Sequence, residues 1–365
     1  MLFLNVMKNI VFILMLSVCV HHVHASESSY SVIEISSNLN EPWGMTFIDH
    51  KSLLITEKTG SLINVNSITG DKFEIEHDLD FYYYGQGGLL DILYHDDYVY
   101  VSYSEDRGDG KSSTSIARGL YNDRKINFQN IFRAEPPIDS GYHFGSRIVI
   151  KDDYLYATVG ERGKGMIAQD VTNHPGSIIR IHLNGSIPKD NPKFIDKPDW
   201  LPEVYQIGVR NPQGMSLSPF DNKIYISNHG ARGGDFFGEV KKGENYGWKI
   251  IGWGGKNYVG TKIGDGSNWK LGFTKPLWTW VPSIAPSNIL IYSGNKFPEW
   301  DGDVLVTSLK SKTLFRLDFE KGVIKNQYII FEDLIGRIRD IEINNNGEIF
   351  LIDSDSSASL WQLKK

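Results

Sequence analysis

Short runs of apolar, β-branched and aromatic residues alternate with polar turns along most of this chain. One unit recurs: an apolar strand, a turn rich in Asp, Asn or Gly, a second strand of β-branched and aromatic residues, and a polar loop. The six copies occupy residues 43–60, 88–108, 145–163, 213–234, 288–313 and 338–357. Each copy predicts a β-hairpin, while helical periodicity of any length is scarce.

The spacing of the copies predicts the fold. Successive copies start roughly 45 to 75 residues apart, which leaves room for four short strands per unit and outer loops of variable length. Repeats of this period built from four-stranded sheets close into a β-propeller. A pair of β-sandwiches would also give evenly spaced strands, but it would not need the same hairpin six times. We therefore predict an all-β fold, a six-bladed β-propeller, as a single domain over residues 26–365.

The amino-terminal segment reads as a secretory signal peptide over residues 1–25. A lysine, Lys8, precedes an apolar run over residues 10–20, and the sequence Val23-His24-Ala25 fits a small-residue cleavage site. The apolar run is shorter than the roughly 20 residues that span a bilayer. We expect a periplasmic or secreted protein with no membrane span after cleavage.

Composition narrows the class of protein further. The one cysteine, Cys19, lies inside the predicted signal peptide, so the mature chain depends on its core and not on disulfides. Lipid attachment at Cys19 is the less favoured alternative, because Val18 is a poor residue before a lipidated cysteine. The net charge of −6 has mixed signs, which argues against binding to nucleic acid or to an anionic membrane surface.

Polar side chains gather at one end of the predicted hairpins. Residues before the first strand and after the second strand of a hairpin lie on the same side, opposite its turn. The residues in these positions are Gln86, His143, Arg147, Arg210, Asn211, Arg337 and Arg339 before first strands, and Glu57, Lys58, Glu105, Arg107, Glu161, Arg162, His229, Gly230, Ala231, Arg232 and Lys310 after second strands. Four of the cations, Arg210, Lys310, Arg337 and Arg339, come from three units and would repel one another without an anion among them. A polycarboxylate or phosphorylated ligand is the simplest partner for them.

At these positions the sequence resembles the soluble pyrroloquinoline-quinone (PQQ) dependent aldose sugar dehydrogenases, also described as glucose/sorbosone dehydrogenase-like proteins. The matching motifs run in family order from Pro42 to Leu360: "EPWGMTF", "GQGGLLDI", "HFGSRIVI", "VGERG", "VRNPQGMSLSP", "NHGARGGD", "GENYGW", "PSIAPS", "SLKSKTLFRL" and "GRIRDI". The resemblance implies a six-bladed propeller that binds PQQ and calcium on one face. It also implies an aldose substrate and an external electron acceptor.

The resemblance assigns roles to individual residues. His143 would take the proton of the sugar's anomeric hydroxyl as a hydride passes to PQQ, which suits a neutral imidazole. Glu161 stands where the family has an aspartate that orients the histidine, and it is one methylene longer. The residues implied to hold PQQ are Gln86, Arg210, Asn211, Tyr258, Lys310, Arg337 and Arg339, of which Tyr258 aligns most loosely.

Two positions bear on calcium. The family holds a calcium beside the cofactor partly through the backbone carbonyls of a Gly-Pro pair, which is Gly230-Ala231 here, and carbonyl ligation tolerates this change. A second family calcium uses a glutamate and a tyrosine, which correspond to Phe236 and Tyr246. Because Phe236 cannot ligate a metal, we predict that the second site is absent or weak.

Two other functions are consistent with a propeller. A calcium-dependent lactonase would need carboxylate and amide ligands at the channel mouth, where this sequence has cations. A non-catalytic secreted propeller that binds a glycan or a protein is favoured by Glu161 and Phe236. It is disfavoured by the presence of His143 together with every cationic position.

Overall fold

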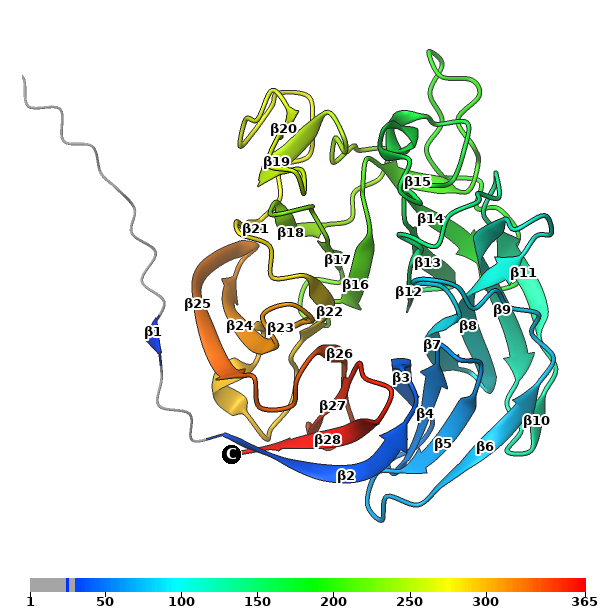
Figure 1. The fold of residues 1–365 in the computed structure, drawn as a ribbon, viewed down its shortest axis with the longest axis vertical. Coiled ribbons are helices and arrows are strands. Elements are labelled where there is room, and N and C mark those ends of the chain that lie inside the picture. The colour runs from blue at the N-terminus through cyan, green and yellow to red at the C-terminus, as the bar shows by residue number, and fades with distance from the viewer. Residues whose placement is uncertain (1–23, 26–29) are drawn as a thin grey trace, which may run out of the picture.

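The computed structural model describes His24–Ala25 and residues 30–365. Six β-sheets of four or five strands each are arranged in a ring around a common centre (Figure 1). The predicted signal peptide, residues 1–25, lies outside the described residues except for His24–Ala25. Within the described part of the chain, no helix is long and apolar enough to cross a membrane.

Each blade is named here by its strands from the centre outward. Blade 1 contains β3 (Pro42–Phe47), β4 (Ser52–Glu57), β5 (Leu62–Asn66) and β6 (Lys72–His77), and blade 2 contains β7 (Leu89–His95), β8 (Tyr98–Asp106), β9 (Ser112–Leu120) and β11 (Gln129–Arg133). Blade 3 contains β12 (Gly145–Lys151), β13 (Tyr154–Val159), β14 (Ser177–His182) and β15 (Val204–Ile207), and blade 4 contains β16 (Pro212–Leu217), β17 (Ile224–Asn228), β18 (Asp235–Glu239) and β21 (Trp278–Trp280). Blade 5 contains β22 (Pro286–Ile291), β23 (Val304–Ser308), β24 (Thr313–Glu320) and β25 (Val323–Glu332), and blade 6 contains β26 (Ile338–Ile343), β27 (Ile349–Asp353), β28 (Ala358–Lys364) and β2 (Ser31–Leu39).

The six predicted hairpins form the two inner strands of the six blades. In blade 3, for example, β12 and β13 pair antiparallel, with Lys151 opposite Tyr154 at the turn and Gly145 opposite Val159 at the open end. The prediction of an all-β, six-bladed propeller is confirmed. The short 3-10 helices η1 (Gly165–Gln169) and η2 (Pro298–Trp300) lie in connecting segments.

The amino-terminal strand closes the ring. Strand β2 pairs antiparallel with β28, with Ser31 opposite Lys364, so the outer strand of blade 6 comes from the start of the described chain (Figure 1). Two short strands extend other sheets: β1 (His24–Ala25) pairs with β25, and β10 (Lys125–Ile126) pairs with β6. Closing a ring of sheets in this way leaves only short sheet edges exposed.

The hydrophobic core lies between neighbouring blades. Buried side chains of adjacent sheets form a cluster at each interface, such as Tyr100 and Ile116 of blade 2 against Ile148 and Leu155 of blade 3. Corresponding clusters join blades 3 and 4, 4 and 5, 5 and 6, 6 and 1, and 1 and 2. Because burial of apolar area drives folding, this packing holds the inner strands and their connecting loops in place.

The centre of the ring is polar. The Nη1 atom of Arg147 lies 2.6 Å from Oδ1 of Asp91 and 3.0 Å from Oδ1 of Asp340, and all three side chains are buried. The Arg147 guanidinium also lies 4.4 Å from the centre of the Trp43 ring. The inner strands of blades 1, 2, 3 and 6 are thereby tied together by one arginine.

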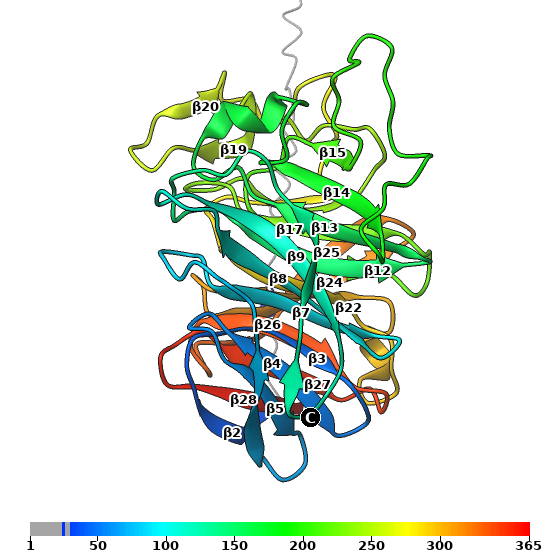
Figure 2. The same ribbon diagram turned by 90° about the vertical axis from the view of Figure 1, so that its right-hand side faces the viewer.

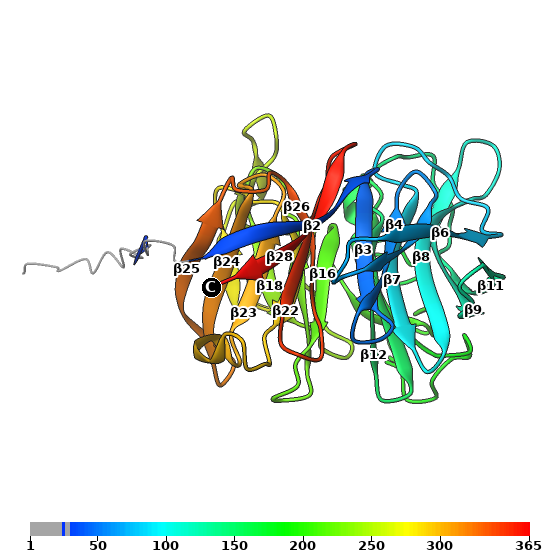
Figure 3. The ribbon, with the colours of Figure 1, turned by 90° about the horizontal axis from the view of Figure 1, so that it is seen from below.

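One long insertion departs from the regular blade pattern. The hairpin of β19 (Ile251–Lys256) and β20 (Lys262–Gly264) lies between β18 and β21 in the sequence and projects from the ring (Figures 1 and 2). The view along the plane of the ring shows the blades side by side with connecting loops at both ends of the strands (Figure 3). The loops that carry the predicted site residues belong to the end opposite the inner hairpin turns.

Candidate active site

His143 and Glu161 flank the inner hairpin of blade 3 and lie in contact. The Nδ1 atom of His143 is 2.6 Å from Oε1 of Glu161, and the other carboxylate oxygen, Oε2, accepts a 2.6 Å hydrogen bond from the backbone N–H of Gly165. The extra methylene of Glu161 therefore does not prevent contact with the histidine. The pairing that the family resemblance implied is present in this structure.

The backbone around His143 has an unusual conformation. His143 has φ 51°, in the left-handed region, and its N–H donates a 2.8 Å hydrogen bond to Oε1 of Gln86. A Cβ atom on Gly160 would lie 2.0 Å from the carbonyl oxygen of His143. Gly160, the first glycine of the "VGERG" motif, is therefore needed for the close approach of the two strand ends.

The electrostatics of the pair favour a neutral histidine. Burial lowers the pKa of His143; the hydrogen bond to Glu161 opposes this change, and the charges of Arg210 and Arg162 add to it. Burial alone would raise the pKa of Glu161, but the hydrogen bonds from His143 and Gly165 hold it below its usual range. Because an ionised carboxylate only accepts hydrogen bonds, Nδ1 carries the histidine proton and Nε2 keeps its lone pair.

Arg162 anchors the loop that carries His143. Its Nε donates to the carbonyl oxygen of Tyr142 at 2.9 Å, and its Nη1 donates to the carbonyl oxygen of Ser112 at 2.8 Å. Its Nη2 donates to Oγ of Ser112 and to the carbonyl oxygen of Ser140. The side chain is 2 % exposed and makes no ion pair among the residues that the structure describes. Sequence analysis placed Arg162 on the same face but gave it no role.

A cavity of about 580 Å³ opens beside this pair. Its lining includes the predicted residues Gln86, Asn211, Arg337 and Arg339, together with Glu41, Trp43, Lys58, Gly85, Gln213, His229, Ala285, Leu309, Ser354, Asp355 and Ser356. We call it the first cavity. Its volume is in the range of ordinary ligand sites. His143 does not line this cavity directly. Its backbone N–H donates a hydrogen bond to Gln86, and Gln86 lines the cavity.

Arg339 is held rigidly at the wall of the first cavity. Its Nη1 donates to Oε1 of Gln213 at 2.9 Å, and its guanidinium lies 5.6 Å from the centre of the Trp43 ring. Its buried Nε has no hydrogen-bond partner among the described residues. Burial, with the charges of Arg337 and Arg147, lowers the pKa of Arg339 to about 9. A buried donor without a partner and a clustered positive charge both fit an anionic ligand.

A second cavity, of about 410 Å³, adjoins the first. Its lining includes Gly230, Ala231, Tyr258 and Lys310, together with His229, Arg232, Pro282, Ser283 and Ala285. Since His229 and Ala285 line both cavities, the two cavities adjoin, and we treat them together as one region. Lys310 and Tyr258 thus line the second cavity, which adjoins the cavity lined by Arg337 and Arg339.

Asn211 lines the first cavity, whereas Arg210 lines neither cavity and acts on His143 through its charge. Nη2 of Arg210 is 3.5 Å from the Tyr258 hydroxyl, and its guanidinium is 5.4 Å from the centre of the Trp248 ring. The charge of Arg210 lowers the pKa of His143, as described above, and it also contributes to the low pKa of His229, about 3, which results mainly from burial. The Oδ1 atom of Asn211 accepts the N–H of Gly145 at 3.0 Å.

The Gly230-Ala231 segment is held by a buried aspartate. Oδ1 of Asp235 accepts the N–H of Gly230 at 2.7 Å, and its Oδ2 accepts the N–H groups of Ile284 and Ala285, each at 2.9 Å. Neither carbonyl oxygen of Gly230-Ala231 accepts a hydrogen bond from the described residues. Two unbonded carbonyls on a fixed loop beside a cavity are suitable ligands for calcium.

Phe236 belongs to the core between blades 3 and 4. Its ring lies 4.5 Å from the Tyr246 ring, and both side chains are buried. The Tyr246 hydroxyl donates to the carbonyl oxygen of Glu239 at 2.7 Å. Among the described residues, no group of three or more His, Cys, Asp or Glu side chains is placed to hold a metal ion. That the second calcium site is absent or weak stays a prediction, based on the side chain of Phe236.

Several residues at the site were not assigned a role from the sequence. Trp43 and Trp248 lie against the guanidinium groups of Arg339 and Arg210, and Gln213 fixes Arg339. Each lies inside one of the family motifs, but only the fold shows which cation it supports.

Comparisons with known proteins identify the family of the chain. A family model described as "Glucose / Sorbosone dehydrogenase" matches residues 39–362. Aldose sugar dehydrogenase YliI of Escherichia coli (strain K12) is 32 % identical over 350 residues, which cover 93 % of this chain and 94 % of that protein. Quinoprotein glucose dehydrogenase B of Acinetobacter calcoaceticus is 26 % identical over 437 residues, covering 92 % of this chain and 87 % of that protein.

Solved structures show the same similarity. The apo-form of the soluble aldose sugar dehydrogenase of Escherichia coli superimposes with a TM-score of 0.87 at 32 % identity, covering 92 % of this chain and 99 % of that chain. The PQQ-bound form of an aldose sugar dehydrogenase from Streptomyces coelicolor has a TM-score of 0.75 at 25 % identity, covering 93 % and 100 % of the two chains.

Proposed function

Because the chain belongs to the glucose/sorbosone dehydrogenase family, we propose that it is a PQQ- and calcium-dependent aldose sugar dehydrogenase that oxidises the anomeric carbon of a sugar to the lactone. The observation that carries this proposal is the His143–Glu161 pair beside a cation-lined cavity. The PQQ-bound structure of the Streptomyces coelicolor relative supports the choice of cofactor.

His143 is the proposed base. Its Nε2 lone pair would accept the proton of the anomeric hydroxyl while Glu161 holds Nδ1–H and stabilises the imidazolium that forms. The lowered pKa keeps the imidazole neutral, and so able to accept a proton, at pH values at which an exposed histidine is largely protonated. Arg162 and Gln86 fix the loop in which the base is held.

The cations around the two cavities would hold PQQ. Arg337 and Arg339 would bind its carboxylates from blade 6, Lys310 from blade 5, and Asn211 from the connection between blades 3 and 4. Arg210, which lines neither cavity but lies beside Tyr258, would add a further positive charge. Gln86 and the exposed ring of Tyr258 would border it. When bound, PQQ supplies the electron-accepting carbon for the hydride.

Calcium would be held in part by the carbonyl oxygens of Gly230 and Ala231. Asp235 keeps this segment in place through its hydrogen bonds to Gly230, Ile284 and Ala285. A calcium ion bound there would supply Lewis-acid chemistry. We further propose that residues 1–25 direct the chain to the periplasm or the medium, which amino-terminal sequencing of the exported protein tests.

Reconstitution tests the proposed function. Purified protein given PQQ and calcium should reduce an artificial dye with several aldoses, and His143→Ala should lose this activity while still binding PQQ. Wild-type protein that binds no PQQ under these conditions would contradict the proposal. A protein that binds PQQ but oxidises no aldose would favour a non-catalytic propeller.

A further inference from the structure

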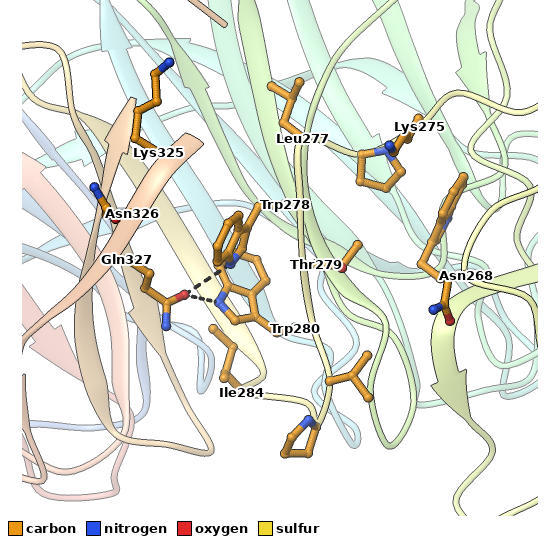
Figure 4. Close-up of a pocket in the computed structure, with 14 residues that line it drawn as sticks. Asn268, Lys275, Leu277, Trp278, Thr279, Trp280, Ile284, Lys325, Asn326 and Gln327 are labelled. Carbon is orange, nitrogen blue, oxygen red and sulfur yellow. Dashed lines mark hydrogen bonds between the residues drawn. The ribbon is translucent and has the colours of Figure 1, made fainter. Parts of the chain in front are cut away.

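A groove of about 660 Å³ lies on the outer side of the propeller, separate from the two central cavities. Its floor is the outer strand of blade 4, β21, and one wall is the outer strand of blade 5, β25 (Figure 4). The opposite wall comes from the insertion that contains β19, through Trp253 and Asn268. We call this site the outer groove.

Two hydrogen bonds determine which polar atom of Gln327 faces the outer groove as a donor. The indole N–H groups of Trp278 and Trp280 donate to the same atom, Oε1 of Gln327, at 3.2 and 2.6 Å (Figure 4). This pairing settles the orientation of the Gln327 amide, because only its oxygen can accept two donors. Both side-chain hydrogen bonds of Gln327 go to Oε1, so among the described residues its Nε2 keeps its donors for a ligand in the groove.

The charged residues of the outer groove also favour a ligand that carries hydrogen-bond acceptors. Lys275 and Lys325 line it and make no ion pair within the described part of the chain, and no Asp or Glu lines it. The remaining lining is largely apolar, from Trp253, Leu277, Val281 and Ile284. A pocket with apolar walls and a few donors takes a ring compound that carries acceptor oxygens.

The outer groove adjoins the candidate active site. Pro282 lines both the groove and the second cavity, which contains Lys310 and Tyr258. Pro282 therefore lies at the boundary between the groove and that cavity. The position suits a molecule that exchanges electrons with a group in the cavity.

We propose that the outer groove binds a quinone, which serves as the electron acceptor of the enzyme. This inference rests on the proposed function, which requires an external oxidant. An aldose gives up two electrons and two protons when it becomes a lactone, and a quinone takes up two electrons and two protons when it becomes a hydroquinone, so the exchange balances. The carbonyl oxygens of a quinone accept hydrogen bonds and donate none. They can therefore accept hydrogen bonds from the Gln327 amide nitrogen and from the two lysines.

Binding can be measured without cofactor or turnover. Three of the nine tryptophans line the groove, so titration of the protein with anthraquinone-2-sulfonate should quench indole fluorescence saturably. Gln327→Glu retains an acceptor for both indoles but replaces the donor by a negative charge. We expect it to weaken binding about ten- to hundredfold. Lys321→Gln lowers the net charge by the same single unit at an exposed site outside the groove and should leave binding unchanged.

Turnover distinguishes this inference from the proposed function. With 1,4-naphthoquinone-2-sulfonate as acceptor, Gln327→Glu should raise KM for the quinone and leave kcat/KM for the aldose unchanged. Quenching that does not saturate, quenching that Gln327→Glu does not alter, or equally tight binding of benzenesulfonate would overturn the quinone site. If the protein binds no PQQ, the proposed function fails, and the fluorescence titration still decides whether the groove binds quinones.

Discussion

The guanidinium carbon of Arg162 lies 3.7 Å from the centre of the Phe144 ring, so the residue after Glu161 is stacked on the residue after His143. Stacking on an aromatic face and hydrogen bonds to backbone carbonyls offset only part of the desolvation cost of a buried cation. The charge has a further consequence, because it contributes to the low pKa of His143. We therefore regard Arg162 as a positioning residue that also tunes the proposed base.

Replacement of Arg162 by Gln should change the pH dependence of the base. Without the positive charge, the pKa of His143 rises, so the imidazole becomes protonated at a higher pH and the acid limb of kcat/KM moves to higher pH. NMR titration of the His143 ring should show the same direction in the protein without cofactor. An unchanged His143 titration in a folded Arg162→Gln variant would refute the electrostatic role.

Arg180 provides a matched control. It is also a buried arginine stacked on an aromatic ring, 3.8 Å from the centre of Tyr154, but it pairs with Asp190 away from the site. Arg180→Gln should lower stability without moving the titration of His143. Arg162→Lys should restore part of the pKa effect because it keeps the charge.

Replacement of Glu161 by Gln should shift the titration in the opposite direction. The amide oxygen can still accept Nδ1–H of His143, but it no longer stabilises the imidazolium, so the pKa of His143 falls further. We expect kcat to fall about 10²- to 10⁴-fold, as for the loss of general-base assistance. The measurement is the pH profile of dye reduction with PQQ titrated separately. A fall in kcat with an acid limb at higher pH would contradict this role.

The sequence predicted the blades well because each hairpin carries its own signal. The turns at 95–98 and 151–154 read directly as Asp-rich turns between apolar strands, and both are hairpin turns in the structure. The outer strands are less visible: β15 and β21 have four and three residues, and β2 pairs with a strand more than 300 residues away. Their pairing depends on the closed ring and not on local pattern.

The candidate site was predictable in its residue types but not in its contacts. The cations that flank the strands were identified because the hairpin geometry places them on one face. That Gln213 bonds Arg339 and that Arg147 joins two aspartates could not be read from the sequence. Such contacts join side chains from different blades, which only the assembled ring brings together.

Arg339 should contribute strongly to PQQ binding. Arg339→Met keeps much of the apolar contact with Trp43 but removes a charge-assisted donor set, so we expect PQQ affinity to fall about tenfold or more. The measurement is titration of the protein with PQQ in the presence of calcium. Arg124→Met, which changes an exposed arginine in the segment between β9 and β10, should bind PQQ as the wild type does. Equal affinity in both variants would argue against the proposed cofactor site.

Arg147 should be essential for stability. Arg147→Met leaves Asp91 and Asp340 buried without their cation, and we expect the free energy of unfolding to fall by about 3–5 kcal/mol. Burial, opposed by Arg147 and assisted by Asp340, already raises the pKa of Asp91 to about 7. In the variant both carboxyls would take up protons more readily, so the loss should be smaller at pH 5 than at pH 8. Urea unfolding at the two pH values measures this, with Lys312→Met, at an exposed ion pair, expected to cost less than about 1 kcal/mol.

Phe236 should prevent a second calcium site, and restoring a glutamate there should not create one. The Phe236 ring is 2 % exposed and packs on Tyr246, whose hydroxyl is already bonded to the carbonyl oxygen of Glu239. Phe236→Glu would bury a carboxylate in the interface between blades 3 and 4, so we expect lower stability and an unchanged calcium stoichiometry. Calorimetric titration with calcium, compared with Phe236→Leu as the apolar control, measures both effects. An additional bound calcium in the Phe236→Glu variant would show that the site lacks only its carboxylate.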